Sequence, residues 1–205
     1  MKALLLALLI SQSAEYTNWE QYDHILRKAR SIQDSGNHGY DPPTGIGCSG
    51  IYADLAVKAS AGGYAIKRWP NDVIITLMFQ GEPATTTIYG AVRYATKSIV
   101  INSDIPQCGA ARTLAHELGH VFTYRTPEMV PGLFEIVAEL IQYGAMKRIY
   151  KNPEFDLDQS TAEYLSLFYK NTKQSVALDQ LTPDMIRDIK LSVYLGVELF
   201  VGEEK

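Results

Sequence analysis

The sequence predicts an α+β protein with a small, mostly antiparallel sheet in its first half and a helical second half. Runs of β-branched and aromatic residues bounded by turn-formers predict strands over residues 73–79, 87–94 and 98–102. The breaks between them, Gly81-Glu82-Pro83 and Thr96-Lys97, are too short for a helical crossover, so antiparallel pairing is expected. From Gly109 onward apolar residues recur every three or four positions, which predicts helices over about 110–124, 131–150, 157–170 and 183–200.

Two more helices are expected before the sheet. Apolar residues at helical spacing run from Trp19 to about Ser31. The stretch 34–50 is rich in Gly, Asn, Asp and Pro and predicts a loop. A second helix is predicted over Ile51 to Ala59, because Gly62-Gly63 follows and would end it.

The N-terminus resembles a secretory signal peptide in its pattern of charge and hydropathy. Lys2 supplies a positive charge, residues 3–10 are apolar, and the small polar stretch Ser11-Gln12-Ser13-Ala14 follows. An apolar helix of this length spans about 12 Å of a hydrocarbon core of about 30 Å, so no stable membrane anchor is expected. We expect residues 1–13 to be removed, residues 14–205 to form a single domain, and the protein to be secreted or extracytoplasmic.

The composition is that of a globular protein with little affinity for nucleic acid. The chain has 205 residues, of which 46% are hydrophobic and 20% charged. It carries 19 Lys and Arg against 23 Asp and Glu, a formal charge of −4, and no basic run is longer than a pair such as Arg27-Lys28. A phosphate backbone is bound through clustered basic residues, which this chain lacks, so a nucleic-acid partner is not expected.

The two cysteines predict a disulfide rather than a metal site. Cys48 and Cys108 are the only cysteines, and both lie beside glycines in loop-like sequence. Export to an oxidising compartment favours a Cys48–Cys108 bond, with two free thiols as the alternative. Since neither cysteine is one of a closely spaced pair, a structural zinc knuckle is excluded.

Residues 116–120 read His-Glu-Leu-Gly-His, which is the pattern H-E-x-x-H on a predicted helix. Two histidines four positions apart lie on the same helix face, so His116 and His120 can bind one zinc ion. Glu117 lies at the edge of that face, where its carboxylate can reach a zinc-bound water and act as general base. The other residues from 113 to 122 are uncharged, so a helix otherwise fit for burial carries three ionisable groups that a metal would satisfy. A core helix whose histidines bond to backbone is the alternative.

Gly119 lies inside this helix and lowers its intrinsic stability by about 1 kcal/mol relative to alanine. We therefore expect another backbone to approach the helix closely at Gly119.

A catalytic zinc site needs a third protein ligand. His24 on an amphipathic helix and His38 in the glycine-rich loop are more simply explained as ordinary surface or satisfied residues. Thr123 and Thr126 stand where the metzincin pattern has its Gly and third His, so that pattern is excluded.

A carboxylate downstream of His120 remains as the candidate for the third ligand. Glu135 and Glu139 lie one turn apart on the next helix, in a narrow polar stripe that either faces solvent or, because the loop is short, faces the metal.

These residues resemble the gluzincins, zinc metallopeptidases whose third ligand is a glutamate on the helix after H-E-x-x-H. The run Glu135-Ile136-Val137-Ala138-Glu139 is similar to the E-G-x-A-E run of one branch, although Ile136 replaces the usual glycine. The resemblance covers about residues 98–143. It implies a zincin-like fold, with the sheet in an upper lobe, a helical lower lobe and the active-site helix between them. It also implies that His116, His120 and Glu135 bind Zn²⁺ and that Glu117 is the general base.

In this resemblance Glu139 is an outer partner that orients a ligand histidine, or an alternative ligand in place of Glu135. The segment Ser98–Ser103 would be the sheet edge to which a peptide substrate adds as a strand. An acid that stabilises the oxyanion is also expected, and the sequence does not choose among the four candidates Tyr143, Tyr164, Tyr169 and Tyr194.

The sequence therefore predicts a secreted zinc metallopeptidase, most simply an endopeptidase, with peptide or protein substrates. Two alternatives stay open at this point. One is a zinc hydrolase of the same fold with a single dedicated substrate, and the other is a catalytically silent binding module, which would be expected to carry a damaged motif.

Overall fold

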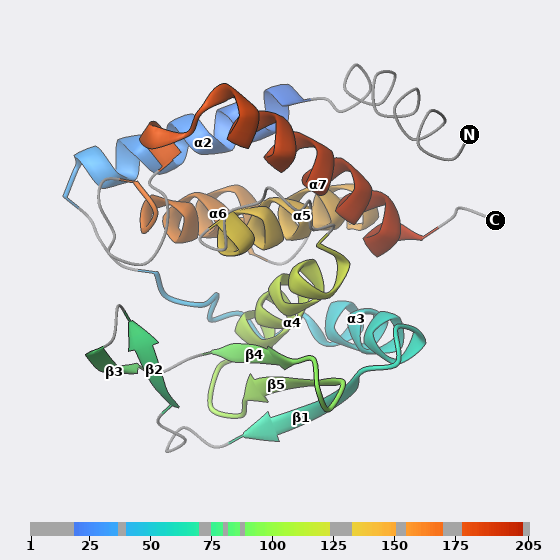
Figure 1. Ribbon diagram of the computed structural model, residues 1–205. Helices are drawn as coiled ribbons and strands as arrows, with labels where there is room; N and C mark the ends of the chain where they lie inside the picture. The colour runs from blue at the N-terminus through green and yellow to red at the C-terminus, as the bar shows by residue number, and fades with distance from the viewer. Residues whose placement is uncertain are drawn as a thin grey trace.

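The computed structural model describes residues 19–36, 40–69, 75–79, 82–86, 89–123, 133–150, 155–169 and 178–202. Over these residues the predicted α+β class is confirmed, with a small sheet and a separate hairpin on one side and most of the helices on the other (Figure 1). The predicted signal peptide and His38 lie outside the described residues. No helix in the described part of the chain has both the length and the apolar character needed to cross a bilayer.

The sheet has three strands in the order β1-β5-β4, formed by Ala65–Trp69, Ser98–Asn102 and Gly90–Arg93. β4 pairs antiparallel with β5, as predicted, and β1 pairs parallel with β5. The central strand β5 is buried along its whole length. On one face its isoleucines Ile99 and Ile101 belong to the main hydrophobic core. This strand therefore joins the sheet to the helices.

Several strand predictions need correction. β1 was missed, because its Lys67-Arg68 pair interrupts the apolar run on an exposed edge. Of the predicted strand 87–94, β4 covers Gly90–Arg93, and residues 87 and 88 lie outside the described residues. The predicted turn at Glu82-Pro83 is wrong, because both residues begin strand β3, Glu82–Thr86, which pairs antiparallel with β2, Ile75–Phe79. A proline is tolerated at such an edge position, since β3 has a single neighbour in the described sheet.

The predicted substrate edge is also wrong. Ser98–Asn102 is the central strand and is paired on both sides, so it has no free backbone groups to offer a peptide. In the three-stranded sheet the edges are β1 and β4, and β4 is the edge that contacts helix α4.

The predicted helices are present, with shifted ends. The helices before the sheet are α2, Trp19–Asp34, and α3, Ser49–Ala61, and both are longer than predicted. The later helices are α4, Gln107–Phe122, α5, Phe134–Ile149, α6, Leu157–Ser166, and α7, Pro183–Val201, with a short 3₁₀ turn at Leu178–Gln180. The Asp156 carboxylate caps α6 by accepting from the Gln159 amide at 2.9 Å.

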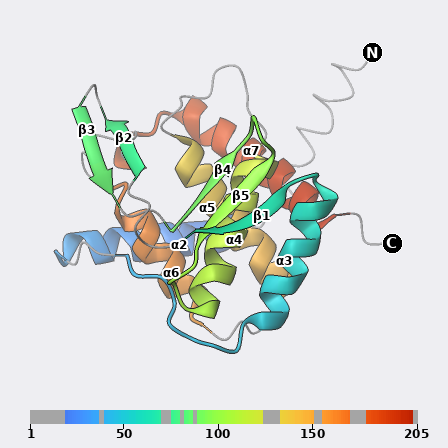
Figure 2. The same ribbon diagram turned by 90° about the horizontal axis from the view of Figure 1, so that it is seen from below.

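Helix α4 lies between the sheet and the layer of α2, α5, α6 and α7, with α3 beside it (Figure 1), and in the view from below the sheet lies in front of α4 (Figure 2). All residues from Cys108 to Gly119 are buried. α4 packs against α5 on one side and against α3, β4 and β5 on the other. A helix buried on so many sides holds its polar side chains in fixed directions, which is what a site built on it requires.

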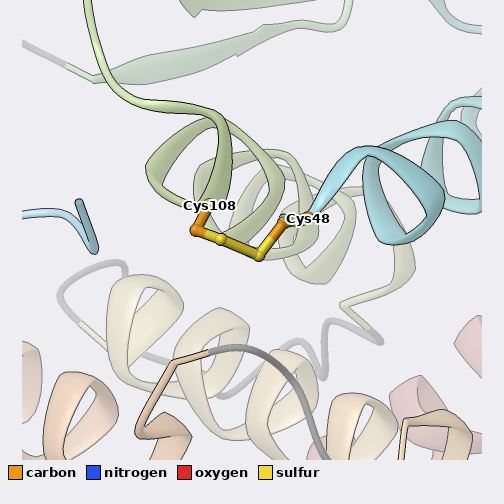
Figure 3. Close-up of a disulfide and its surroundings, with 2 residues drawn as sticks. All are labelled: Cys48 and Cys108. Atoms are coloured by element: carbon orange, nitrogen blue, oxygen red, sulfur yellow. A yellow bond between two sulfur atoms is a disulfide. The ribbon is translucent and has the colours of Figure 1, made fainter. Parts of the chain in front are cut away.

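The predicted Cys48–Cys108 disulfide is present (Figure 3). Cys48 immediately precedes α3 and Cys108 lies in the first turn of α4, and both are fully buried. The Cys108 amide also donates to the Gly45 carbonyl at 2.9 Å. The bond therefore fixes the segment before α3 to the start of the helix that carries the His-Glu-Leu-Gly-His motif.

Candidate metal centre

Helices α4 and α5 bring together three side chains with metal-binding atoms. His116 and His120 lie on the same face of α4, and Glu135 lies in the first turn of α5. One ligand atom from each lies within 4.8 Å of the other two. Two imidazole nitrogens and a carboxylate oxygen form a donor set that zinc takes in catalytic sites, where three protein ligands leave one position open. The residues present therefore fit a zinc ion.

Glu135 bridges the two histidines. Its Oε2 lies 3.3 Å from His116 Nε2 and its Oε1 lies 3.3 Å from His120 Nε2. The side chain of Glu135 is 46% exposed, whereas His116 is 7% exposed and His120 is 14% exposed. The cluster is thus closed on the side of the histidines and open to solvent on the side of Glu135.

Glu139 has a different position, although it lies only one turn further along α5. Its Oε2 lies 2.9 Å from His116 Nδ1, and its Oε1 accepts a hydrogen bond from the Arg112 guanidinium. Glu139 is fully buried. Because it contacts the ring nitrogen of His116 that faces away from Glu135, its place is that of an outer partner that orients a ligand histidine. The sequence left the order of the two glutamates open, and the geometry distinguishes them.

A close approach of α5 to α4 makes this arrangement possible. A Cβ added at Gly119 would lie 2.3 Å from the Ala138 carbonyl oxygen, which confirms the approach of another backbone predicted there. The two helices thus meet at Gly119, which lies between the two histidines of α4, and at Ala138, which lies between the two glutamates of α5. In the polar stripe of α5, Glu139 and Gln142 are fully buried and face inward, whereas Glu135 at the start of the helix is half exposed.

Glu117 is buried on α4 beside the ligand cluster. Burial raises the pKa of its carboxyl group, the positive charges of His120 and His116 oppose this rise, and the Glu135 carboxylate reinforces it. The edge strand leaves room for this side chain, since a Cβ at Gly90 would lie 2.9 Å from Glu117 Oε1. Nothing in the sequence around Gly90 indicated that this glycine makes room for Glu117.

Tyr164 on α6 is the tyrosine that the fold brings to the cluster. Its hydroxyl donates to Glu135 Oε2 at 2.8 Å and lies 3.5 Å from His116 Nε2. Burial and the charge of Glu135 raise the pKa of Tyr164 well above its usual value, so the phenol stays protonated as a donor. Among the other candidates Tyr143 bonds to Asp158 and Tyr169 bonds to the Leu26 carbonyl.

The carboxylates also determine the charge of the histidine they surround. Burial by itself would lower the pKa of His116, but hydrogen bonds to Glu135 and Glu139 and their negative charges raise it to about 10. Partial burial would raise the pKa of Glu135, but its contacts with both histidines hold the pKa well below its usual range. A metal cation would replace the proton that this cluster attracts.

Sequence reasoning missed Arg112 and Tyr40. Arg112 is fully enclosed on α4, and its guanidinium carbon lies 4.9 Å from the centre of the Tyr40 ring and 5.2 Å from that of Tyr164. Arg112 lies four residues before His116, which places it on the same helix face and could have indicated its role. His24 lies on α2, away from the cluster.

Comparisons of this chain with protein-family models, curated proteins and solved structures find no match.

Proposed function

We propose that this protein is a secreted zinc-dependent peptidase of the gluzincin type, with His116, His120 and Glu135 as metal ligands. One observation carries the proposal: three donors from two helices converge on one point, and Glu117 lies beside that point on the same helix as the histidines. The arrangement of α4 between a sheet and a helical lobe supports a zincin-like fold (Figure 1). The disulfide is compatible with an oxidising compartment outside the cytoplasm.

Bound zinc would supply a water of lowered pKa, near 7, and would polarise the carbonyl of a peptide bond. Glu117 would accept the proton of the attacking water and pass it to the leaving amine. Burial raises the pKa of Glu117 toward the range in which a carboxylate exchanges protons efficiently near neutral pH.

Tyr164 is proposed as the donor that stabilises the negative charge that develops on the carbonyl oxygen. Its hydroxyl lies beside His116 Nε2 and Glu135 Oε2, at the margin of the ligand cluster. Its raised pKa keeps the proton on the phenol, and a fixed donor beside a developing oxyanion lowers the barrier.

Strand β4 is proposed as the edge to which an extended peptide adds, in place of Ser98–Ser103. β4 pairs with β5 on one side only in the described sheet, and its first residue, Gly90, lies directly over Glu117. A peptide that pairs with β4 would pass across the face of the ligand cluster.

The test is metal content and cleavage together. The purified protein is expected to bind close to one zinc per chain and to cleave an unbiased peptide library. Glu117→Gln should retain the zinc and lower the cleavage rate by about 10²–10⁴-fold, because it loses only proton transfer. A Glu117→Gln protein as active as wild type would refute this mechanism. Zinc binding without any cleavage of the library would favour a dedicated substrate or a silent binding module.

A further inference from the structure

A buried arginine is linked to the ligand cluster through Glu139. Arg112 is on α4, one turn before His116, and is 2% exposed. Its guanidinium donates to Glu139 Oε1, and its Nε donates to Ser160 Oγ at 3.1 Å. Arg112 thus ties α4 to α5 and to α6 at one point.

The contacts form a continuous chain from the arginine to the proposed metal ligand. Arg112 holds one oxygen of Glu139, and the other oxygen of Glu139 lies 2.9 Å from His116 Nδ1. Every member of this chain is buried. A buried carboxylate left with one unpaired oxygen would be costly, so the contact with Arg112 fixes the rotation of Glu139.

The orientation of His116 depends on this carboxylate. A histidine that binds a metal through Nε2 must carry its proton on Nδ1, and the acceptor facing Nδ1 determines that tautomer. The rings of Tyr40 and Tyr164 enclose the guanidinium with its carbon 4.9 and 5.2 Å from their centres. These rings leave Arg112 little freedom to turn away from Glu139.

We propose that Arg112 is a positioning residue of the metal centre: by holding Glu139 in place as the acceptor that faces His116 Nδ1, it orients His116 for zinc. This inference rests on the proposed zinc site and adds a residue to it. The competing explanation is that Arg112 only joins three helices, in which case it affects the stability of the fold and leaves the metal affinity of the folded protein unchanged.

The experiment measures zinc affinity by competition with a chromophoric chelator, together with the visible absorption of the Co²⁺-loaded protein, which reports ligand geometry. The variants are Arg112→Met, Arg112→Lys, Glu139→Gln and the double variant Arg112→Met/Glu139→Gln. Removing one partner of a buried pair is destabilising, but replacing both is often tolerated, so the double variant keeps the test informative if Arg112→Met fails to fold. Arg148→Met is the matched control, because Arg148 lies on α5 and pairs at 2.6 Å with Glu198 on the surface.

Arg112→Met and Glu139→Gln are each expected to weaken zinc binding by about 10–100-fold and to change the Co²⁺ spectrum. The double variant should be no weaker than Glu139→Gln alone, since Arg112 acts through Glu139. Arg112→Lys should recover part of the affinity, and Arg148→Met should match wild type.

Two results would overturn the inference while leaving the proposed function intact. One is wild-type zinc affinity and an unchanged Co²⁺ spectrum in folded Arg112→Met. The other is a double variant in which the two losses simply add. A wild-type protein that binds no zinc would overturn both proposals.

Discussion

Two glutamates one turn apart on α5 lie in different surroundings, and we propose different roles for them. Glu135 lies at the start of the helix and is half exposed, so it can face an incoming ion and substrate. Glu139 lies one turn deeper, fully buried, and is paired with Arg112 and His116. The oxygens of Glu135 face the Nε2 atoms of both histidines, whereas Glu139 meets only the outer nitrogen of His116. The first glutamate is therefore the better ligand.

At the residue scale this difference predicts a ranking of metal affinity. Glu139→Gln should weaken zinc binding by about 10–100-fold, as outer partners of metal ligands do, and Glu135→Gln should weaken it further because a ligand is removed. Equilibrium competition for zinc measures both values. The reverse ranking would make Glu139 the ligand.

A second residue-scale prediction concerns Tyr164. Tyr164→Phe should retain one zinc per chain and lower kcat by about 10²–10³-fold, the usual loss when one oxyanion donor is removed. KM should change little, because the donor acts mainly in the transition state. Steady-state kinetics on a cleaved peptide measures both constants. Tyr143→Phe removes a hydroxyl bonded to Asp158 and is the matched control, with activity expected near wild type.

At the scale of elements the contact between α4 and α5 decides whether the cluster forms. A methyl group at Gly119 would meet the backbone of Ala138, so Gly119→Ala should lower the free energy of unfolding by about 1–3 kcal/mol, the usual cost of overpacking. Denaturant titration measures this value. A decrease in the free energy of unfolding would indicate close packing, because in a free helix interior alanine stabilises the helix by about 1 kcal/mol relative to glycine.

Gly50 offers the control for that experiment. It lies in helix α3, and an added Cβ there would contact nothing within 4 Å. Gly50→Ala should therefore be neutral or raise the free energy of unfolding by about 0.4–1 kcal/mol. Equal effects of the two substitutions would show that α4 and α5 are less closely packed than the structure indicates.

At the scale of the whole molecule the disulfide joins the segment before α3 to α4 across 60 residues of chain. Closing a loop of that length lowers the conformational entropy of the unfolded chain, which stabilises the folded state by about 4 kcal/mol. Cys48→Ser/Cys108→Ser should lower the free energy of unfolding by about that amount, as measured by denaturant titration. A change of less than about 1 kcal/mol would contradict this explanation.

The charge of the cluster predicts how metal binding depends on pH. The carboxylates raise the pKa of His116 to about 10 in the metal-free protein, so zinc must displace a proton at neutral pH. Zinc affinity should then rise with pH by up to about tenfold per unit below pH 10. Competition assays between pH 6 and 8 measure the slope. An affinity that does not change over this range would contradict the prediction.

Local patterns in the sequence predicted the elements that depend on short-range chemistry. Helical spacing identified the helices, and the H-E-x-x-H motif placed two histidines on one face of α4. The strands were predicted less well, because pairing partners lie far apart in sequence: Ala65–Trp69 pairs with Ser98–Asn102. The choice of Tyr164 depended on how α6 packs over the cluster, which no local pattern encodes.

By itself the sequence determined the α+β class, the disulfide partners and the three residues of the motif, since these follow from residue identity and spacing. Only the tertiary structure decided which glutamate faces the histidines, which strand is the edge and that Arg112 lies behind His116. Those facts depend on the packing of α4, α5 and α6 against one another. Packing is determined by contacts between residues distant in the chain, and a single sequence does not display them.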